Sequence, residues 1–247
     1  MAGFFDRVIT VYGRKPALEA LQDPNLECHR LHLADSNKPA SILEEMKALA
    51  EKRGLEICIH SKRELSRISR KGSQDQGVAV DVHCPGFQSL EDFLATSQAD
   101  KPQRLLAADG ITNPQNVGML VRSAVAAGID GILWPRNGNA ALGPLAIKAS
   151  AGTLFRAPLV RCRELHTALE QCRESGYRVY TLAADAAETL FEHSAPERAI
   201  YVLGGESHGV SKQVTDLADG GIAIPMHNDV ESLNVAVTAA LVAFRVS

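Results

Sequence analysis

From residue 104 to the end of the chain, short hydrophobic runs alternate with helix-like segments. The runs read as strands because they are apolar, four to six residues long and bounded by turn residues; they lie at Leu105–Ala108, Gly131–Trp134, Arg178–Ala183, Ala199–Leu203 and Gly221–Ile224. Such alternation predicts an α/β fold with a mostly parallel sheet covered on both faces. Ligands of these sheets bind at the carboxyl ends of strands, so we expect the site in the loops after Ala108, Leu203 and Ile224.

The first 85 residues predict a second, smaller α/β unit. Its expected strands are Arg30–Ala34, Leu55–His60 and Gly77–His83, and its expected helices open at Pro16, Ser41 and Ser61. Glu44 and Glu64 each follow a serine by three residues, which predicts two capping boxes. The stretch from Cys84 to Pro102 is rich in turn residues and favours a linker. We therefore expect domains at 1–86 and 104–247, joined by a linker at 87–103.

Composition narrows the functional class. Of 247 residues, 45% are hydrophobic, which is enough for a buried core. The longest apolar stretch, Leu233–Phe244, is too short and too rich in alanine for a membrane span. The five cysteines are odd in number and form no C-x-x-C pair, which favours reduced thiols and a cytoplasmic location over a zinc site or a disulfide framework.

One segment is strongly basic although the net charge of the chain is −3. Between Lys52 and Lys71 there are seven Lys and Arg residues against two glutamates. Such a patch can hold nucleic-acid phosphates, and the basic side chains considered for this are Arg63, Arg67, Arg70 and Lys71. The alternative is an ordinary solvated helix face.

The first candidate loop leads into a helix with clear end signals. Asn113 suits the N-cap, Pro114 the first helical position and Gly128 the C-terminal cap. Arg122 lies off the apolar stripe, one turn beyond Gly118, whose missing side chain leaves room for a ligand or for a second backbone. On helix signals alone, a surface arginine is the favoured interpretation of Arg122.

The second candidate loop follows a hydrophobic strand and contains Gly204, Gly205, Glu206 and Gly209. It lacks the G-x-G-x-x-G order of a dinucleotide-binding turn and the G-K-[ST] ending of a phosphate loop. This argues against an oxidoreductase. Glycines beside one carboxylate suit close backbone contact with a neutral or cationic ligand.

The third candidate loop follows Pro225 and ends in a helix that is apolar almost all round. Ser232 and Asn234 flank its start, and Arg245 is the one charged residue within residues 233–246. A helix without a polar face must be buried on several sides. For a terminal helix this predicts a subunit interface and hence a homodimer.

Together the three loops resemble the SpoU/TrmH family of SPOUT RNA methyltransferases. The matching motifs are N-x-G-x-x-x-R-S-A at 116–124, K-x-S-A-G at 148–152, G-x-E-x-x-G at 204–209, and I-P-M at 224–226 with V-E-S-L-N-V at 230–235. The resemblance covers about residues 104–247. Residues 8–85 resemble the substrate-binding domain of the branch that modifies 23S ribosomal RNA. Ser207 and Asn228 stand where the family usually has glycine, and asparagine readily accepts a left-handed backbone.

The resemblance implies an S-adenosylmethionine-dependent RNA 2′-O-ribose methyltransferase. It implies a parallel sheet whose C-terminal segment forms a trefoil knot, no metal, and cofactor contacts from Leu203, Gly204, Gly205, Ile224, Met226, Leu233 and Asn234. It assigns RNA as the partner, with 23S ribosomal RNA at a guanosine favoured. Transfer RNA, a drug-binding ribosomal RNA loop and a non-catalytic ribosome-assembly role are the alternatives.

In the family, the arginine of the first motif stabilises the alkoxide that develops at the ribose hydroxyl, and here that arginine is Arg122. Because guanidinium stays protonated, we expect Arg122 to stabilise the developing oxyanion and hold RNA phosphate rather than act as a base. The residues expected to position it and the ribose are Asn116, Glu206, Ser232 and Asn234. His208 and His227 are rival bases, although solvent-facing loop histidines are the favoured interpretation of both.

Overall fold

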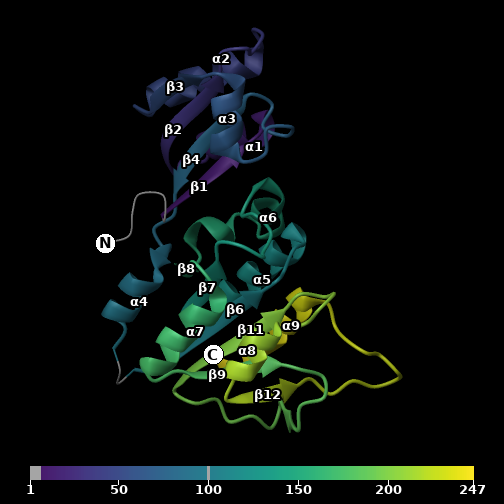
Figure 1. Cartoon of the computed structure of the whole chain (residues 1–247). Coiled ribbons are helices and arrows are strands. Elements are labelled where there is room, and N and C mark those ends of the chain that lie inside the picture. Colours follow the sequence, from purple (N-terminus) through teal and green to yellow (C-terminus); the bar gives the residue numbers. More distant parts are fainter. Residues whose placement is uncertain (1–6, 99–100) are drawn as a thin grey trace. The chain divides into compact units, whose positions relative to one another are not determined.

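The computed structural model describes residues 7–98 and 101–247, which form two compact units, Arg7–Pro85 and Gly86–Ser247 (Figure 1). Residues 99–100 of the expected linker lie outside the described part of the chain. Each unit has its own sheet, so each is described by itself.

The N-terminal unit has a four-stranded sheet in the order β1-β4-β2-β3. Its elements are β1 (Val8–Tyr12), α1 (Arg14–Gln22), β2 (Glu27–Ala34), α2 (Ser41–Lys52), β3 (Glu56–His60), α3 (Lys62–Ser69) and β4 (Val78–His83). Strand β4 is antiparallel to β1 and β2, whereas β2 and β3 are parallel. Leu65 of α3 packs on Ala34 and Ala79. The sheet residues that alternate with these, such as Leu31 and Val80, are also buried, which places α1 and α2 on the other face.

The two predicted capping boxes have different outcomes. At α3 the box is confirmed, because the Ser61 hydroxyl accepts a bond from the Glu64 N–H and the Glu64 carboxylate accepts one from the Ser61 N–H. At α2 the prediction is wrong. Ala40 is the N-cap and Ser41 already lies inside the helix, so its hydroxyl caps nothing.

The C-terminal unit has an eight-stranded sheet in the order β10-β12-β9-β11-β6-β7-β8-β5, with parallel pairing throughout (Figure 1). Its strands are β5 (Gln88–Ser89), β6 (Gln103–Asp109), β7 (Gly131–Pro135), β8 (Leu159–Cys162), β9 (Arg178–Leu182), β10 (Glu188–Thr189), β11 (Arg198–Gly204) and β12 (Gly220–Ala223). Its helices are α4 (Leu90–Thr96), α5 (Pro114–Ala127), α6 (Pro144–Ala149), the 3-10 turn η2 (Thr153–Arg156), α7 (Leu165–Glu174), α8 (Lys212–Leu217) and α9 (Val235–Val246). The predicted parallel α/β fold is confirmed.

The segment expected to be a linker belongs structurally to this unit. Strand β5 pairs with β8, and Leu90 and Phe93 of α4 lie in the core cluster that also contains residues of β6 and β11. The turn residues do mark irregular backbone at the start of this stretch, and the short apolar helix expected around Leu90–Leu94 is present as α4, with its apolar face buried in the core. Its burial makes the C-terminal unit begin at Gly86 rather than at residue 104.

Helix α9 packs along α5 and reaches β11 and β6. Its buried side chains include Val235, Ala239 and Val242, whereas Val237 and Phe244 are 48% and 61% exposed. The helix is therefore covered on one side by its own subunit. Among the described residues, no helix is long and apolar enough to cross a bilayer.

Candidate functional site

The three candidate loops meet because their strands are neighbours in the sheet. Strands β12, β9, β11 and β6 lie side by side and parallel, so their carboxyl ends share one edge (Figure 1). This is the edge at which open α/β sheets bind ligands.

A cavity of about 190 Å³ opens at this edge, many times the space that one water needs. Six residues expected to contact a cofactor line it, namely Leu203, Gly204, Gly205, Ile224, Met226 and Leu233. Its walls are mainly apolar side chains and glycine backbone, with the carboxylates of Glu206 and Glu231 as the charged groups. The cavity therefore offers shape and backbone contact to a ligand with an apolar body, and negative charge to a cationic part of it.

Three of the predicted site residues form one hydrogen-bonded cluster. The Asn116 side-chain amide donates to Glu206 Oε1 at 2.9 Å, and that of Asn234 donates to the same oxygen at 3.0 Å. Asn234 Nδ2 also lies 3.1 Å from Asn116 Oδ1. The three residues come from the three separate loops, so this cluster ties the loops together and fixes the Glu206 carboxylate, which lines the cavity.

Local structure positions Asn116 and Asn234 in this cluster. Asn116 lies in the first turn of α5, which Asn113 caps and Pro114 opens, as predicted. Asn116 is buried. Asn234 is the N-cap of α9, where its Oδ1 accepts a bond from the Ala236 N–H at 2.9 Å.

The glycine loop is held by Asp109 at the end of β6, a residue that the motif analysis missed. The Asp109 carbonyl accepts a bond from the Gly205 N–H at 2.8 Å, and its carboxylate accepts one from the Ser211 N–H at 2.7 Å. Both ends of the loop that carries Glu206 are thus tied to β6. The available signal was the position of Asp109 directly after a predicted strand.

The space left by Gly118 is filled by a second backbone and not by a ligand. A Cβ at this position would lie 2.3 Å from the Ala146 carbonyl oxygen and 2.6 Å from the Ala149 Cβ. Helix α6 therefore approaches α5 closely only because residue 118 has no side chain. The motif around Ser150, itself fully buried, packs on the motif around Gly118.

Backbone geometry also explains two other motif positions. A Cβ on Gly204 would lie 2.1 Å from the Gly209 carbonyl carbon, so this glycine allows the loop to fold back on itself. Asn228 has φ 58°, the left-handed conformation expected where relatives have glycine. The substitution is therefore compatible with the turn.

The structure does not bring the other two predicted catalytic residues into the cluster. Arg122 and Ser232 are exposed, and no hydrogen bond joins either of them to Asn116, Glu206 or Asn234 within the described residues. Ser232 lines the cavity, and Arg122 lies on α5 less than two turns after Asn116. His208 and His227 are exposed loop residues, in agreement with the favoured interpretation of both.

Leu182, Ala183 and Ala184, at and after the end of β9, form a wall of the cavity that no sequence motif indicated. The strand Arg178–Ala183 was predicted, and the rule that ligands lie at carboxyl ends of strands applied to it as well. Its loop contains no glycine or charged motif, so nothing else marked it.

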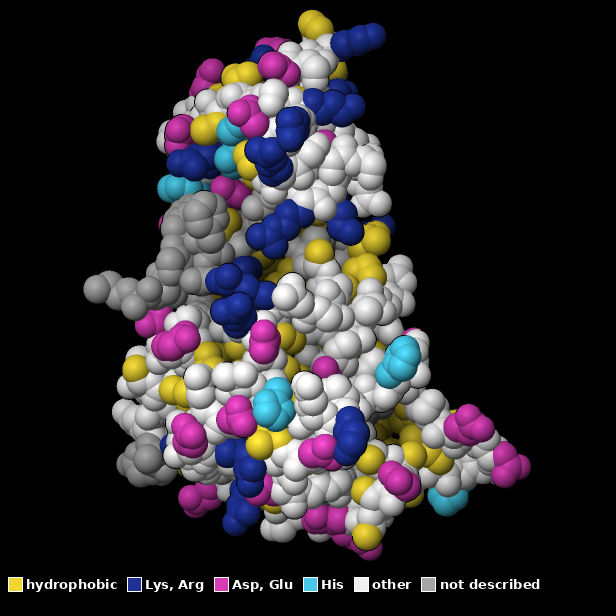
Figure 2. Space-filling view, in the orientation of Figure 1, with side chains coloured by type: hydrophobic (Ala, Val, Ile, Leu, Met, Phe, Trp, Pro, Cys, Tyr) yellow, Lys and Arg dark blue, Asp and Glu magenta, His cyan; other side chains and the backbone are white. Residues whose placement is uncertain are grey.

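The basic residues of the N-terminal unit are exposed and available. Arg63 and Arg67 lie on α3, Arg70 is its C-cap with φ 55°, and Lys71 follows. Figure 2 shows Lys and Arg side chains gathered over the part of this unit where Figure 1 labels α3. We call Arg63, Arg67, Arg70 and Lys71 the basic surface.

Two known protein families match this chain, one over each unit. The SpoU rRNA Methylase family matches residues 103–244, and the family described as RNA 2′-O ribose methyltransferase substrate binding matches residues 10–88. An uncharacterized tRNA/rRNA methyltransferase of Mycolicibacterium vanbaalenii is 33% identical over 94% of this chain and 74% of its own length. One of Mycobacterium tuberculosis is 31% identical over 96% of this chain and 73% of its own.

Two solved structures share the fold. A TrmH-family protein of Porphyromonas gingivalis superposes with a TM-score of 0.63 at 25% identity, covering 98% of this chain and 90% of that one. The SpoU methyltransferase AviRb of Streptomyces viridochromogenes superposes with a TM-score of 0.65 at 20% identity, covering 97% and 89%.

The fold, the site and these relatives define an RNA methyltransferase that uses S-adenosylmethionine. The chain belongs to the SpoU rRNA Methylase family.

Proposed function

We propose that this enzyme methylates the 2′-hydroxyl of a ribose in RNA, and that its substrate is a guanosine of 23S ribosomal RNA. The observation that carries the proposal is the cluster of Asn116, Glu206 and Asn234 beside an apolar cavity at the carboxyl edge of the sheet. The match of residues 10–88 to a substrate-binding domain of 2′-O ribose methyltransferases supports the choice of the ribose.

The cavity fits S-adenosylmethionine in its chemistry. Leu203, Ile224 and Leu233 offer apolar surface to an adenine ring, and the glycine backbone at 204–205 allows close approach. Glu206 and Glu231 add negative charge to the cavity wall, which would suit a ligand that carries a sulfonium and an ammonium. When bound there, the cofactor supplies an activated methyl group. Asn234 supports the same wall through its bond to Glu206.

The protein's own task is to make the ribose hydroxyl a nucleophile. The cofactor would supply the methyl group and would itself depart as a neutral thioether, so the residues of this chain have to position the 2′-oxygen and let its hydroxyl proton pass to solvent. Negative charge builds on that oxygen, and Arg122 supplies a fixed positive charge on the helix that also carries Asn116. Ser232 lines the cavity, and we expect it to hold the ribose.

The N-terminal unit would supply most of the RNA affinity. The basic surface presents four positive side chains on and just after a short helix, and charge neutralisation of phosphates dominates nucleic-acid binding.

We also propose that the enzyme is a homodimer through α9. Val237 and Phe244 are separated by seven residues and so lie on one side of the helix, which leaves an exposed apolar stripe. Stable dimer interfaces resemble a protein core cut in half, and this stripe has that composition.

The experiment is methylation in vitro followed by mass mapping. Unmethylated 23S ribosomal RNA and a transfer RNA pool are incubated separately with the enzyme and S-adenosylmethionine, then digested and sequenced by mass. We expect one added methyl on a guanosine ribose of 23S RNA, and resistance to alkali at that linkage, because cleavage requires a free 2′-hydroxyl. Methylation of transfer RNA, or of a drug-binding ribosomal loop, would favour an alternative substrate, and methylation on a base would contradict the proposal.

A further inference from the structure

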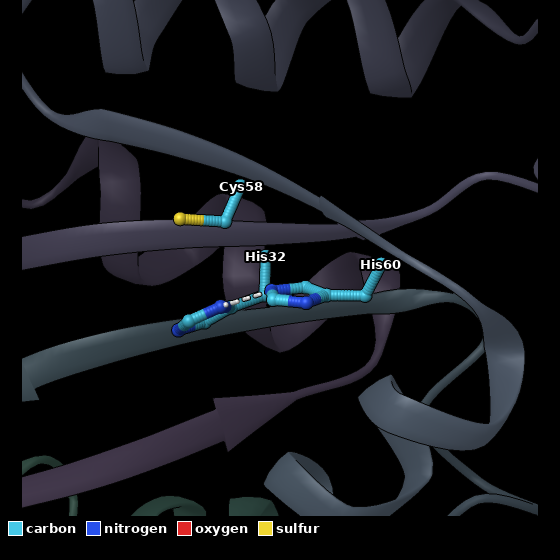
Figure 3. Close-up of side chains that lie close together, drawn as sticks. All are labelled: His32, Cys58 and His60. Carbon is cyan, nitrogen blue, oxygen red and sulfur yellow. Dashed lines mark hydrogen bonds between the residues drawn. The ribbon is translucent and has the colours of Figure 1, made fainter.

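A cluster of potential metal ligands lies on one face of the N-terminal sheet, apart from the methyltransferase site. His32 on β2 is the register partner of Cys58 on the parallel strand β3, and His60 follows Cys58 by two residues. Side chains alternate along a strand, so all three project to the same side of the sheet. Figure 3 shows them together, with the two imidazole rings next to each other.

The three side chains are close enough to share one ion. His32 Nδ1 and His60 Nε2 are 2.9 Å apart. One ring nitrogen of each histidine and the Cys58 sulfur all lie within 4.8 Å of one another. Tetrahedral zinc with bonds of about 2.0–2.3 Å separates its ligand atoms by roughly 3.4–3.6 Å. The nitrogens need to move apart by roughly half an ångström and the sulfur to approach by roughly one, which side-chain rotation provides.

Asp81 on β4 prepares His32 for this role. Its carboxylate lies 3.0 Å from His32 Nε2, and the Thr10 hydroxyl donates to its other oxygen at 2.7 Å. An ionised carboxylate accepts only, so the proton of the His32 ring is held on Nε2 and the lone pair of Nδ1 faces His60 and Cys58. A carboxylate behind the far nitrogen of a histidine is the common arrangement around metal-binding histidines.

We propose that His32, Cys58 and His60 form a binding site for a divalent transition-metal ion of the zinc type. Two imidazole nitrogens and one thiolate suit such an ion, and the fourth position is left to solvent. His32 is buried whereas Cys58 and His60 are half-buried, so an ion can enter from the side of the edge strand β3.

Binding requires two small changes at β3. The Cys58 thiol, which now bonds to the Glu56 carboxylate, turns toward the histidines and releases its proton to solvent. The His60 ring places its proton on Nδ1 and presents the Nε2 lone pair. The ion would then fasten the edge strand to β2, immediately before Ser61, the N-cap of the basic helix α3.

The absence of a C-x-x-C pair did not exclude this site. Its ligands come from two strands whose residues are 26 to 28 positions apart, and only the parallel register of β2 and β3 brings them together. The family resemblance implied no metal, and the scattered cysteines gave no sign of ligands that meet only across two strands.

Cobalt binding followed by absorption tests the proposal in the full-length protein under a non-thiol reductant. We expect one Co²⁺ per chain in tetrahedral geometry, with visible ligand-field bands and a near-ultraviolet charge-transfer band from the thiolate. Zn²⁺ should displace it. Cys58→Ser should remove the charge-transfer band, and His60→Gln should weaken affinity at least tenfold. The matched control is His83→Gln. His83 lies on β4 and hydrogen-bonds to Glu27 rather than to the cluster, so this variant should bind cobalt as the wild type does.

Melting curves give an independent readout. Zn²⁺ should raise the melting temperature of the wild type and of His83→Gln but not of Cys58→Ser, because an ion that binds only the folded state stabilises it. Absence of a thiolate–cobalt band in folded wild-type protein would overturn the proposal. Equal binding by Cys58→Ser would overturn it too, because the ion would then lie elsewhere.

Discussion

Asn234 uses both ends of its side-chain amide, and each end serves a different purpose. Its oxygen caps α9 by accepting a bond from the Ala236 N–H, which contributes about 1 kcal/mol to helix stability. Its nitrogen donates to Glu206 and Asn116 and thereby joins two loops of the site. One residue therefore links the fold of the last helix to the geometry of the site.

Asn234→Asp separates these two purposes. The aspartate keeps the capping oxygen, so the N-cap of α9 should be preserved, but it places a carboxylate against Glu206 and should disrupt the cluster. Loss of a hydrogen bond to a charged group costs about 1.5–3 kcal/mol, so kcat/KM should fall roughly tenfold to hundredfold. Asn234→Ala should lose both activity and about 1 kcal/mol of stability. Wild-type methylation by Asn234→Asp would show that the cluster is only structural.

At the scale of single elements, local sequence patterns predicted helix ends but not the features that depend on distant parts of the chain. The caps of α5 and α3 were predicted correctly because their signals are local. Strand β8 (Leu159–Cys162) was not predicted, and what makes it a strand is pairing with β7 and β5, which are distant in sequence. The partner of Gly118 could not be predicted either, since α6 meets α5 only in the folded chain.

Helix α3 carries a prediction about RNA binding. Neutralising Arg63, Arg67 and Arg70 to Gln should lower RNA affinity and flatten its salt dependence. Each lost phosphate contact removes about 0.7–0.9 from the slope of log affinity against log salt, so three should remove roughly 2. The matched control neutralises Lys15, Lys47 and Lys52 on α1 and α2 to Gln, an equal change in charge. Equal slopes for the two variants would make α3 an ordinary solvated face.

Helix α9 carries a prediction about the oligomeric state. Phe244→Asp places a charge on the exposed stripe and should give a folded monomer in sedimentation velocity, with the circular dichroism of the wild type. Val242 and Ala239 face the core of their own subunit, so an aspartate at either position should unfold the protein instead. A monomeric wild type would contradict the dimer.

At the scale of the whole molecule, the expected two-unit organisation and the structural division agree in the N-terminal unit and differ after it. The division falls between Pro85 and Gly86. The reason is energetic: Leu90 and Phe93 are buried in the core of the C-terminal unit, and each such side chain contributes about 1.5–3 kcal/mol. Composition marked the polar stretches, but only tertiary packing determines to which unit a short helix belongs.

This difference predicts the behaviour of two fragments. A fragment of residues 86–247 should fold and bind S-adenosylhomocysteine in calorimetry as the full chain does, while its RNA affinity drops strongly. A fragment of residues 104–247 should be unstable, because losing roughly 3–6 kcal/mol is a large part of the stability of a typical domain. Strong RNA binding by the first fragment would contradict the role proposed for the N-terminal unit.

The most direct test of the central claim measures methyl transfer and cofactor binding in Arg122 variants. If Arg122 stabilises charge that exists only in the transition state, Arg122→Ala should lower kcat on the order of 10²–10³ and leave S-adenosylhomocysteine affinity nearly unchanged. Arg122→Lys should be nearly as poor, because lysine keeps the charge but loses the planar fork. If Arg122→Ala turns over the mapped RNA at the wild-type rate, the claim is contradicted, and His208 and His227 become the residues to test for proton removal.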